Sequence, residues 1–447
     1  MEEDSMANLE PKVEQGNNQE KPRSPLALYF SLPIISWALY DFANTIFSSN
    51  IITIFFPFYL QEVIGTNERM DQIASTFLSY ANATASFFLV LFSPLFGVMI
   101  DRTGKRKKFI IPFTLIAVFS TILMGVFASL QTSQTMFGLP ISFILVLLLF
   151  VVAKFFFHSS LIFYDTMLPD LGTKKELPLI SGFGIAVGYM GTLLGLTVYL
   201  YVGDSDFHRA FIPTGVLFLL FSLPLFFIFK EKPKEIQEKK SFFSGYKEIY
   251  QTFKEMRLYR PVFLFMIAYF FINDAIATAI AMMAIYARAI GGFSATEFIL
   301  LYLVSTVSSI IGSFIYGYIS RNIGSKLAVA SVAGLLIVAL CFAVFAIAPW
   351  MLWLAGSLFG VALGATWVTS RTFIIELTPE GKRGQFFGLF AFSGKVSSIV
   401  GPLLYGTITL VLAGYGNLAS RTALGSLIIL AFIGLIITLR VPYKKEA

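Results

Sequence analysis

The sequence has 447 residues, of which 56% are hydrophobic and 13% charged, with a formal net charge of +7. Soluble domains carry about 25% charged residues, so this chain lacks the polar surface that a soluble protein of its size needs. Its basic residues lie in short loops between long apolar runs, which argues against a nucleic-acid partner and indicates that membrane lipid surrounds most of the chain.

Chemistry that depends on thiols or metals is poorly supported. Cys341 is the one cysteine, and His158 and His208 are far apart, so the sequence offers no disulfide and no metal-ligand spacing. The sequence also lacks a glycine-rich nucleotide-binding loop. We therefore expect no cofactor, no metal and no enzymatic activity.

Residues 1–27 are acidic and have no apolar segment, which is typical of a disordered cytoplasmic tail. Twelve apolar runs follow, each long enough for a helix to cross a bilayer. In lipid, a helix satisfies all its backbone hydrogen bonds within one segment, so we predict an all-α membrane protein. The runs are 33–59, 75–100, 109–130, 140–167, 178–202, 210–230, 261–288, 296–320, 327–347, 350–377, 385–412 and 421–440.

The distribution of lysine and arginine predicts the orientation. With both termini in the cytoplasm, 26 of these residues lie on the cytoplasmic side and 4 on the other side. An excess of lysine and arginine is typical of the cytoplasmic loops of a membrane protein. We expect a multi-pass protein of the cell (inner) membrane in a bacterium, or of a vacuolar or lysosomal membrane in a eukaryote.

The runs divide into two six-helix bundles, 28–230 and 261–440, followed by a short cytoplasmic tail at 441–447. The connecting linker, 231–260, has aromatic residues at helical spacing with lysines between them, which predicts an amphipathic helix on the membrane surface. Ser93 and Gly97 after the second run match Ser313 and Gly317 after the eighth. Repeats in the same orientation are found in transporters whose substrate binds between the halves, near the bilayer midplane.

The segment G-V-M-I-D-R-T-G-K-R-K-K follows the second run and resembles the signature loop of the major facilitator superfamily. Its fixed positions are Gly97, Asp101, Arg102, Gly104 and Arg106. Glycine permits close helix approach and tight turns, and an aspartate accepts hydrogen bonds from a helix N-terminus or an arginine. The resemblance implies a conformational latch between the two halves.

The first run contains W-A-L-Y-D-F-A-N, which resembles the first-helix signature of the vacuolar-effluxer-like, autophagy-linked branch of that superfamily. The resemblance continues in F-Y-D-T-M-L-P-D-L (163–171), I-N-D-A-I-A-T (272–278) and Q-F-F-G-L-F-A-F-S-G-K (385–395). It covers most of the chain, and it implies export of small solutes such as amino acids. At 275 this sequence has alanine where members of the branch often have glycine.

Six charged residues lie inside the apolar runs, where ions are costly and usually functional or paired. The acids are Asp41, Asp165 and Asp274, and the bases are Lys154, Arg371 and Lys395. Asn44 is three residues from Asp41 and is expected on the same helix face.

Two interpretations of these charges remain open. In one, Asp41 or Asp274 exchanges a proton, and Lys395 or Arg371 anchors a substrate carboxylate. In the other, the charges are static braces, with Asp165 and Arg371 as the best candidates. The resemblance implies that the first, fourth, seventh and tenth runs line the central cavity and that the eleventh borders it.

Glycines on the fifth run lie on one smooth face, at Gly184, Gly188, Gly191 and Gly195. Small residues allow membrane helices to approach closely. We expect this face mainly to provide close packing. Because the fifth and eighth runs meet between the halves in this superfamily, we also expect that packing to serve sliding there.

We therefore predict an alternating-access secondary transporter that exports a small polar solute, coupled to protons. The alternatives are a cation-coupled sugar or glycoside symporter, a non-transporting receptor, and a lipid flippase. Its partners are expected to be a small-molecule substrate and membrane lipid, and the protein is expected to be a monomer.

Overall fold

A computed structural model describes residues 25–65, 68–103, 105–130, 134–136, 139–172, 177–231, 259–378 and 383–443, with isolated positions 247, 250 and 254. The tail 1–27, except for its last three residues, most of the linker 231–260, and the end of the tail 441–447 therefore lie outside the described residues. The predicted amphipathic helix falls in that part of the chain.

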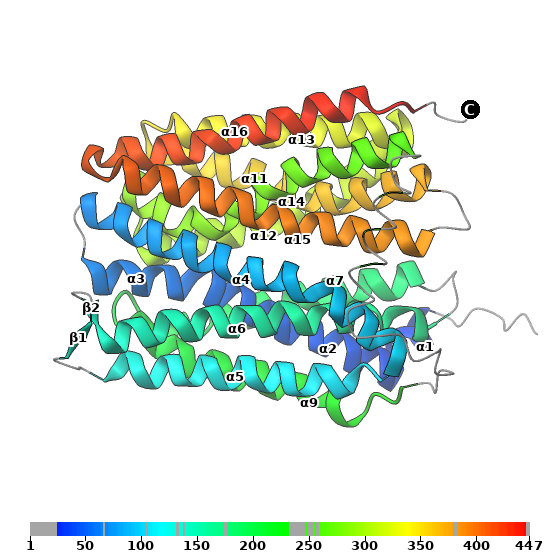
Figure 1. Ribbon diagram of the computed structural model, residues 1–447, viewed down its shortest axis with the longest axis horizontal. Helices are drawn as coiled ribbons and strands as arrows, with labels where there is room; N and C mark the ends of the chain where they lie inside the picture. Colours follow the sequence, from blue (N-terminus) through cyan, green and yellow to red (C-terminus); the bar gives the residue numbers. More distant parts are fainter. Residues whose placement is uncertain are drawn as a thin grey trace, which may run out of the picture.

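Helices form almost all of the described structure (Figure 1). The first half contains α1 (Pro25–Tyr29), α2 (Leu32–Phe47), η1 (Ser48–Phe55), α3 (Phe56–Ile64), α4 (Glu68–Thr103), α5 (Lys107–Ser129), α6 (Ile141–Asp165), η2 (Leu168–Asp170), α7 (Leu177–Leu196), α8 (Tyr199–Val202), η3 (Phe207–Ala210) and α9 (Phe211–Phe227). The second contains α11 (Arg260–Gly291), α12 (Ala295–Ile323), α13 (Ser325–Val344), α14 (Pro349–Leu377), α15 (Arg383–Val411), η5 (Ala413–Tyr415) and α16 (Asn417–Arg440).

Two very short strands, β1 (Thr135–Met136) and β2 (Leu139–Pro140), pair antiparallel in the loop between α5 and α6. Eleven of the described helical segments are long and apolar enough to cross a membrane. The remaining predicted run, 178–202, falls on α7 and α8. The all-α membrane fold is therefore confirmed.

Helix ends follow ordinary sequence signals. Ser294 and Glu297 form a reciprocal capping box at the start of α12, with the Ser294 hydroxyl accepting from the Glu297 N–H and the Glu297 carboxylate accepting from the Ser294 N–H. At the other end of α12, Gly324 has φ +89°, which permits the tight turn into α13.

The first predicted helix, 33–59, differs from the expectation of one regular helix. Its central segment, η1, is a π-helix, in which the Thr53 hydroxyl donates to the Ser48 carbonyl five residues back. The Asn50 amide donates to the Gly195 carbonyl at 2.9 Å and to the Thr214 hydroxyl at 3.1 Å. These cross-helix bonds hold the widened turn, and widened turns of this kind are frequent at functional sites.

The two halves lie side by side, with α2–α9 below and α11–α16 above in Figure 1. Helix α1 and the end of α16 lie at the same end of the molecule, which we call the terminal end; the opposite end, with β1 and β2, is the far end. This arrangement agrees with two termini on one side of the membrane.

The glycine face of α7 packs within the first half, so its predicted role in sliding between the halves is wrong. A methyl group on Gly188 would lie 2.8 Å from the Asp41 carboxylate, and one on Gly191 would overlap the backbone of Phe42. In the second half, a methyl group on Gly401 would overlap Asp274 and Thr278 of α11. The glycines therefore allow α2 to pack closely against α7, and α11 against α15, because backbone or side-chain atoms of the neighbouring helix occupy the space of a methyl group.

Contacts between the halves run from the middle of the molecule to the far end. Thr76 of α4 and Thr409 of α15 share a hydrogen bond of 3.0 Å, and Ser420 donates to Gln72 at 3.0 Å. Phe58 meets Phe298 edge to face, 5.6 Å between ring centroids. The described halves are thus closed against each other at the far end.

Candidate transport site

A cavity of about 220 Å³ lies between the two halves. Residues of α2, η1 and α7 form one wall, and residues of α11, α12 and α14 form the other. Polar atoms on the walls come from hydroxyl groups. They belong to Thr45, Ser48, Thr53, Tyr189, Thr192, Tyr302, Ser305, Thr306 and Ser309.

The two halves also contact each other at this cavity. The hydroxyls of Tyr189 and Ser309 lie 3.1 Å apart across it. Apolar residues including Ile280, Met283 and Phe359 complete its lining. A concave, largely apolar pocket with several fixed polar groups is the usual form of a small-molecule site.

Asp41 lies one helical turn before Thr45, whose hydroxyl donates to the Asp41 carbonyl at 2.8 Å. The half-buried carboxylate of Asp41 lies against Gly188 of α7, and any side chain at position 188 would displace this carboxylate. Tyr164 of α6 lies within electrostatic range of both Asp41 and Asp165. Asp41 is therefore adjacent to the cavity, at the terminal-end side of Thr45.

Asn44 is buried and is not among the residues that line the cavity. Neither atom of its side-chain amide has a hydrogen-bond partner among the described residues. It lies on the face of α2 that also carries Tyr40 and Phe47, which contact α5, α6 and α9. The structure thus places Asn44 in the interior of the first half.

Lys154 is buried in α6, where its ammonium donates to the side-chain carbonyl of Asn82 on α4. His158, one turn further along α6, lies within electrostatic range of both Lys154 and Lys395. Lys395 of α15 lies within range of Asp165, the exposed last residue of α6. Electrostatic interactions thus connect Lys395 of the second half with His158 and Asp165 of the first half.

Lys154 donates to a neutral amide, whereas Lys395 interacts with the opposite charge of Asp165, so the predicted pairing of the six charges stays a prediction. The expected brace between Asp165 and Arg371 cannot be located, since the side chain of Arg371 lies outside what the structure describes. Sequence reasoning passed over His158 and Asn82. His158 carried a signal, a polar residue on an apolar membrane helix one turn from Lys154, whereas Asn82 has no charged residue at that spacing.

Asp274 is buried in α11, at its joint with α15, and does not line the cavity. One carboxylate oxygen accepts the Gly401 N–H at 2.9 Å and the Thr278 hydroxyl at 3.5 Å. The second oxygen is buried and has no partner in the described part of the chain. Next to it, the Asn273 amide donates to the Gly394 carbonyl and the Ser397 hydroxyl.

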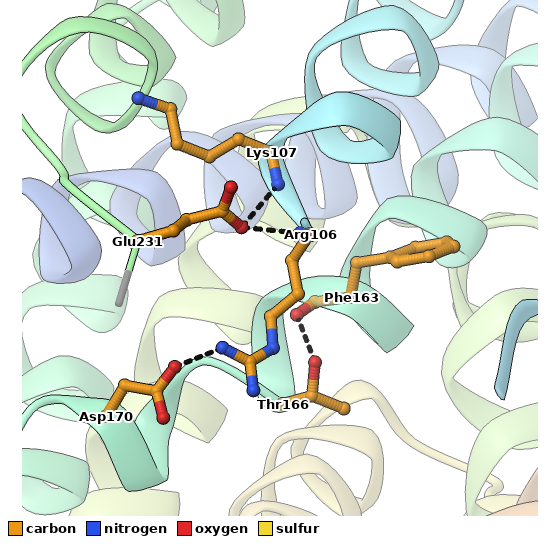
Figure 2. Close-up of polar contacts among 6 residues, drawn as sticks. All are labelled: Arg106, Lys107, Phe163, Thr166, Asp170 and Glu231. Atoms are coloured by element: carbon orange, nitrogen blue, oxygen red, sulfur yellow. Dashed lines mark hydrogen bonds and ion pairs between the residues drawn. The ribbon is translucent and has the colours of Figure 1, made fainter. Parts of the chain in front are cut away.

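At the terminal end, Figure 2 shows how the signature loop is fixed to its own half. The guanidinium of Arg106 pairs with Asp170 of η2. The Glu231 carboxylate accepts the backbone N–H groups of Arg106 and Lys107, which caps the start of α5. The Lys107 ammonium donates to the Phe229 carbonyl at 2.7 Å.

These partners of Arg106 belong to the first half, whereas the resemblance implied a latch between halves. The side chains of Asp101 and Arg102, the surroundings of Gly97, and all of Gly104 lie outside the described residues, so the latch itself stays a prediction. Asp170 and Glu231 were missed as partners; Asp170 stands in a quoted motif, but nothing in the spacing joins it to Arg106.

Two six-helix halves around a central cavity define a transporter of the major facilitator type. A point mutant of the nucleoside transporter NupG has the same fold, with a TM-score of 0.70 at 12% identity over 91% of this chain and 100% of its own. A bacterial homologue of the iron transporter ferroportin in an inward-facing state superposes with a TM-score of 0.64 at 15% identity, covering 92% and 100%.

Sequence comparison narrows this class. Residues 33–447 match the family described as vacuole effluxer Atg22 like, and the chain belongs to this family. The MFS-type transporter YxiO of Bacillus subtilis is 28% identical over 423 residues, which covers 92% of this chain and 95% of the relative. Autophagy-related protein 22 of Kluyveromyces lactis is 26% identical over 269 residues, 54% of each chain.

Proposed function

We propose that this transporter exports small zwitterionic solutes, amino acids above all, in exchange for protons. The proposal rests on charges of both signs, from both halves, that interact electrostatically, together with Asp41 one turn from the wall of the cavity. Lys395 comes from the second half, whereas Asp41, Lys154, His158 and Asp165 come from the first. The names of the fungal relatives, which link them to autophagy, also fit a role in releasing solutes from a vacuole.

A zwitterion matches this arrangement. Lysine ammonium groups bind carboxylates through charge-assisted hydrogen bonds, and an aspartate binds an ammonium in the same way. In the proposal, Lys395 binds the substrate carboxylate and Asp41 or Asp165 binds its amino group. The apolar part of the cavity, with Met283 and Phe359, then holds the side chain.

We assign the coupling proton to Asp41 rather than to Asp274. Asp41 is half-buried and adjacent to the cavity, so substrate and proton act on the same group. Asp274 is buried between α11 and α15 and does not line the cavity, so we assign it a structural role. A ligand shifts a conformational equilibrium only by binding one state better, and a shared acid provides that difference.

The test uses protein in liposomes that contain a pH-sensitive dye. Adding an amino acid should move protons with the wild type, and Asp41→Asn should abolish this movement. Asp41→Asn should still exchange labelled for unlabelled amino acid, because exchange needs no net proton movement. Asp206→Asn is the matched control, since Asp206 is exposed at the far end and asparagine tolerates its left-handed backbone.

Unchanged proton movement in Asp41→Asn would remove that residue from coupling. Coupling lost in Asp274→Asn but kept in Asp41→Asn would transfer the role to Asp274. For Lys395→Gln we expect at least a tenfold higher KM for the amino acid, and an unchanged KM for the matching amine without a carboxylate.

Cation-coupled sugar transport is the second candidate, and the many hydroxyls on the cavity wall favour it. Sugars present hydroxyl groups that pair with serine, threonine and tyrosine, and Tyr189 and Tyr302 also offer ring surfaces. In the liposome assay, a response to sugars and none to amino acids would select this candidate.

A further inference from the structure

A second hollow lies on the outer surface of the second half, away from the transport cavity. It is a groove with a volume of about 660 Å³, formed where α13 ends beside α15 and the start of α16. Helices α13 and α16 lie at the edge of the molecule farthest from the first half (Figure 1). The groove therefore faces the surrounding lipid.

The walls of the groove are apolar and one end is cationic. Val344, Leu404, Ile408 and Leu430 line it, and so does the guanidinium-bearing side chain of Arg421. Helix α16 leaves this space open at Gly425, where an added methyl group would meet only Val344, at 3.9 Å. An unfilled apolar space of this size is uncommon in a packed protein and suits a flexible hydrocarbon chain.

Arg421 is held in place by neutral partners. Its guanidinium donates to the carbonyls of Val344 and Ala346, the latter at 2.7 Å. The ion pairs found among the described residues do not include Arg421. Two of its five N–H donors have these named partners, so its positive charge is fixed and is not neutralised by a carboxylate there.

The position of Arg421 along helix α16 is compatible with contact to a lipid phosphate. Helix α16 has 24 residues and is thus about 36 Å long, slightly more than the hydrocarbon thickness of about 30 Å. Arg421 lies four residues after the start of α16, so about 6 Å from that end. If α16 is centred in the bilayer, Arg421 lies about 3 Å inside the hydrocarbon boundary, from which a long basic side chain reaches the lipid phosphates, with the groove extending toward the hydrocarbon.

We propose that this groove is a binding site for an anionic phospholipid, whose acyl chain fills the space beside Gly425 and whose phosphate binds Arg421. Arginine presents donors that match phosphate oxygens. A positive charge that no described carboxylate neutralises favours anionic over neutral lipid. The site is independent of the transported solute and of proton coupling.

Native mass spectrometry of the full chain, exchanged from mixed micelles of phosphatidylglycerol and phosphatidylcholine with the same acyl chains, tests the site. The wild type should retain one phosphatidylglycerol in preference to phosphatidylcholine. Arg421→Gln keeps a donor for the carbonyls but removes the charge, and it should weaken phosphatidylglycerol binding at least fivefold. Arg421→Lys should keep most of the preference.

Gly425→Leu tests the acyl-chain part, because its side chain occupies the open space without a clash. It should abolish retention of the bound lipid. Gly334→Leu on α13 is the matched control, since an added methyl group at Gly334 meets nothing within 4 Å and Gly334 lies outside the groove; its lipid binding should equal the wild type. Thermal unfolding confirms that each variant is folded.

Equal phosphatidylglycerol retention in the wild type, Arg421→Gln and Gly425→Leu would overturn the proposal. So would a dimer that Gly425→Leu dissociates, because the groove would then be covered by a second copy of the chain.

Discussion

At the scale of single residues, the charges inside the membrane occupy two different settings. Asp41 lies one helical turn from Thr45, which is on the wall of the cavity. Asp274 instead receives the Gly401 N–H inside a helix joint. Charged residues in membrane helices are functional candidates by default, and the contacts of each one separate transport from packing.

The first prediction concerns the close contact between α11 and α15 at Asp274. Gly401→Ala adds a methyl group that overlaps the Thr278 hydroxyl and the Asp274 carboxylate, so we expect a loss of about 1–3 kcal/mol in unfolding free energy. Thermal unfolding in detergent measures it. In the control Gly334→Ala, the methyl group enters open space and should stabilise the helix slightly. Equal effects of the two substitutions would show that the α11–α15 joint is loosely packed.

At the scale of helices, composition and periodicity were sufficient to locate the twelve membrane segments. They did not locate the π-helix η1, because its cause is tertiary: the Asn50 amide reaches Gly195 and Thr214 on other helices. Glycine spacing likewise identified a smooth face on α7 but not its partner, which is α2. Which helix a face meets depends on the whole bundle and is not encoded in that segment alone.

Asn50 gives the prediction at this scale. Asn50→Leu removes both cross-helix hydrogen bonds and leaves the Gly195 carbonyl without this donor, so we expect a destabilisation of about 1–3 kcal/mol. Thr214→Val removes one of the two bonds and should have a smaller effect. Melting temperatures of the two variants compare these losses. If Thr214→Val proved the more damaging, the widened turn would not depend on Asn50.

At the scale of the whole molecule, the two halves form a transporter closed at its far end. The paired signature segments predicted two repeats, and the observed bundles agree with that arrangement. The cavity was harder to predict. Its polar groups are hydroxyls such as those of Ser305 and Ser309, which in the sequence are typical of helix packing and carry no charge.

A disulfide across the closed end tests this state. In a Cys341→Ser background, Thr76→Cys with Thr409→Cys should cross-link readily, since the native hydroxyls are 3.0 Å apart. The cross-link should stop transport by holding the far end shut, and a reducing agent should restore it. Each single cysteine variant should transport with and without oxidant. Full activity of the cross-linked protein would mean that these two helices do not separate during transport.

The glycine contacts in each half have a consequence for how this sequence can vary. At Gly191 a methyl group would overlap the backbone of Phe42, and at Gly401 it would overlap the side chains of Thr278 and Asp274, so any other amino acid destabilises the protein whatever its polarity. At Gly334 and Gly425 the space is open, and many amino acids fit. Substitutions that persist over evolution should therefore gather on the outer helices α13 and α16, while the seams α2–α7 and α11–α15 stay nearly fixed.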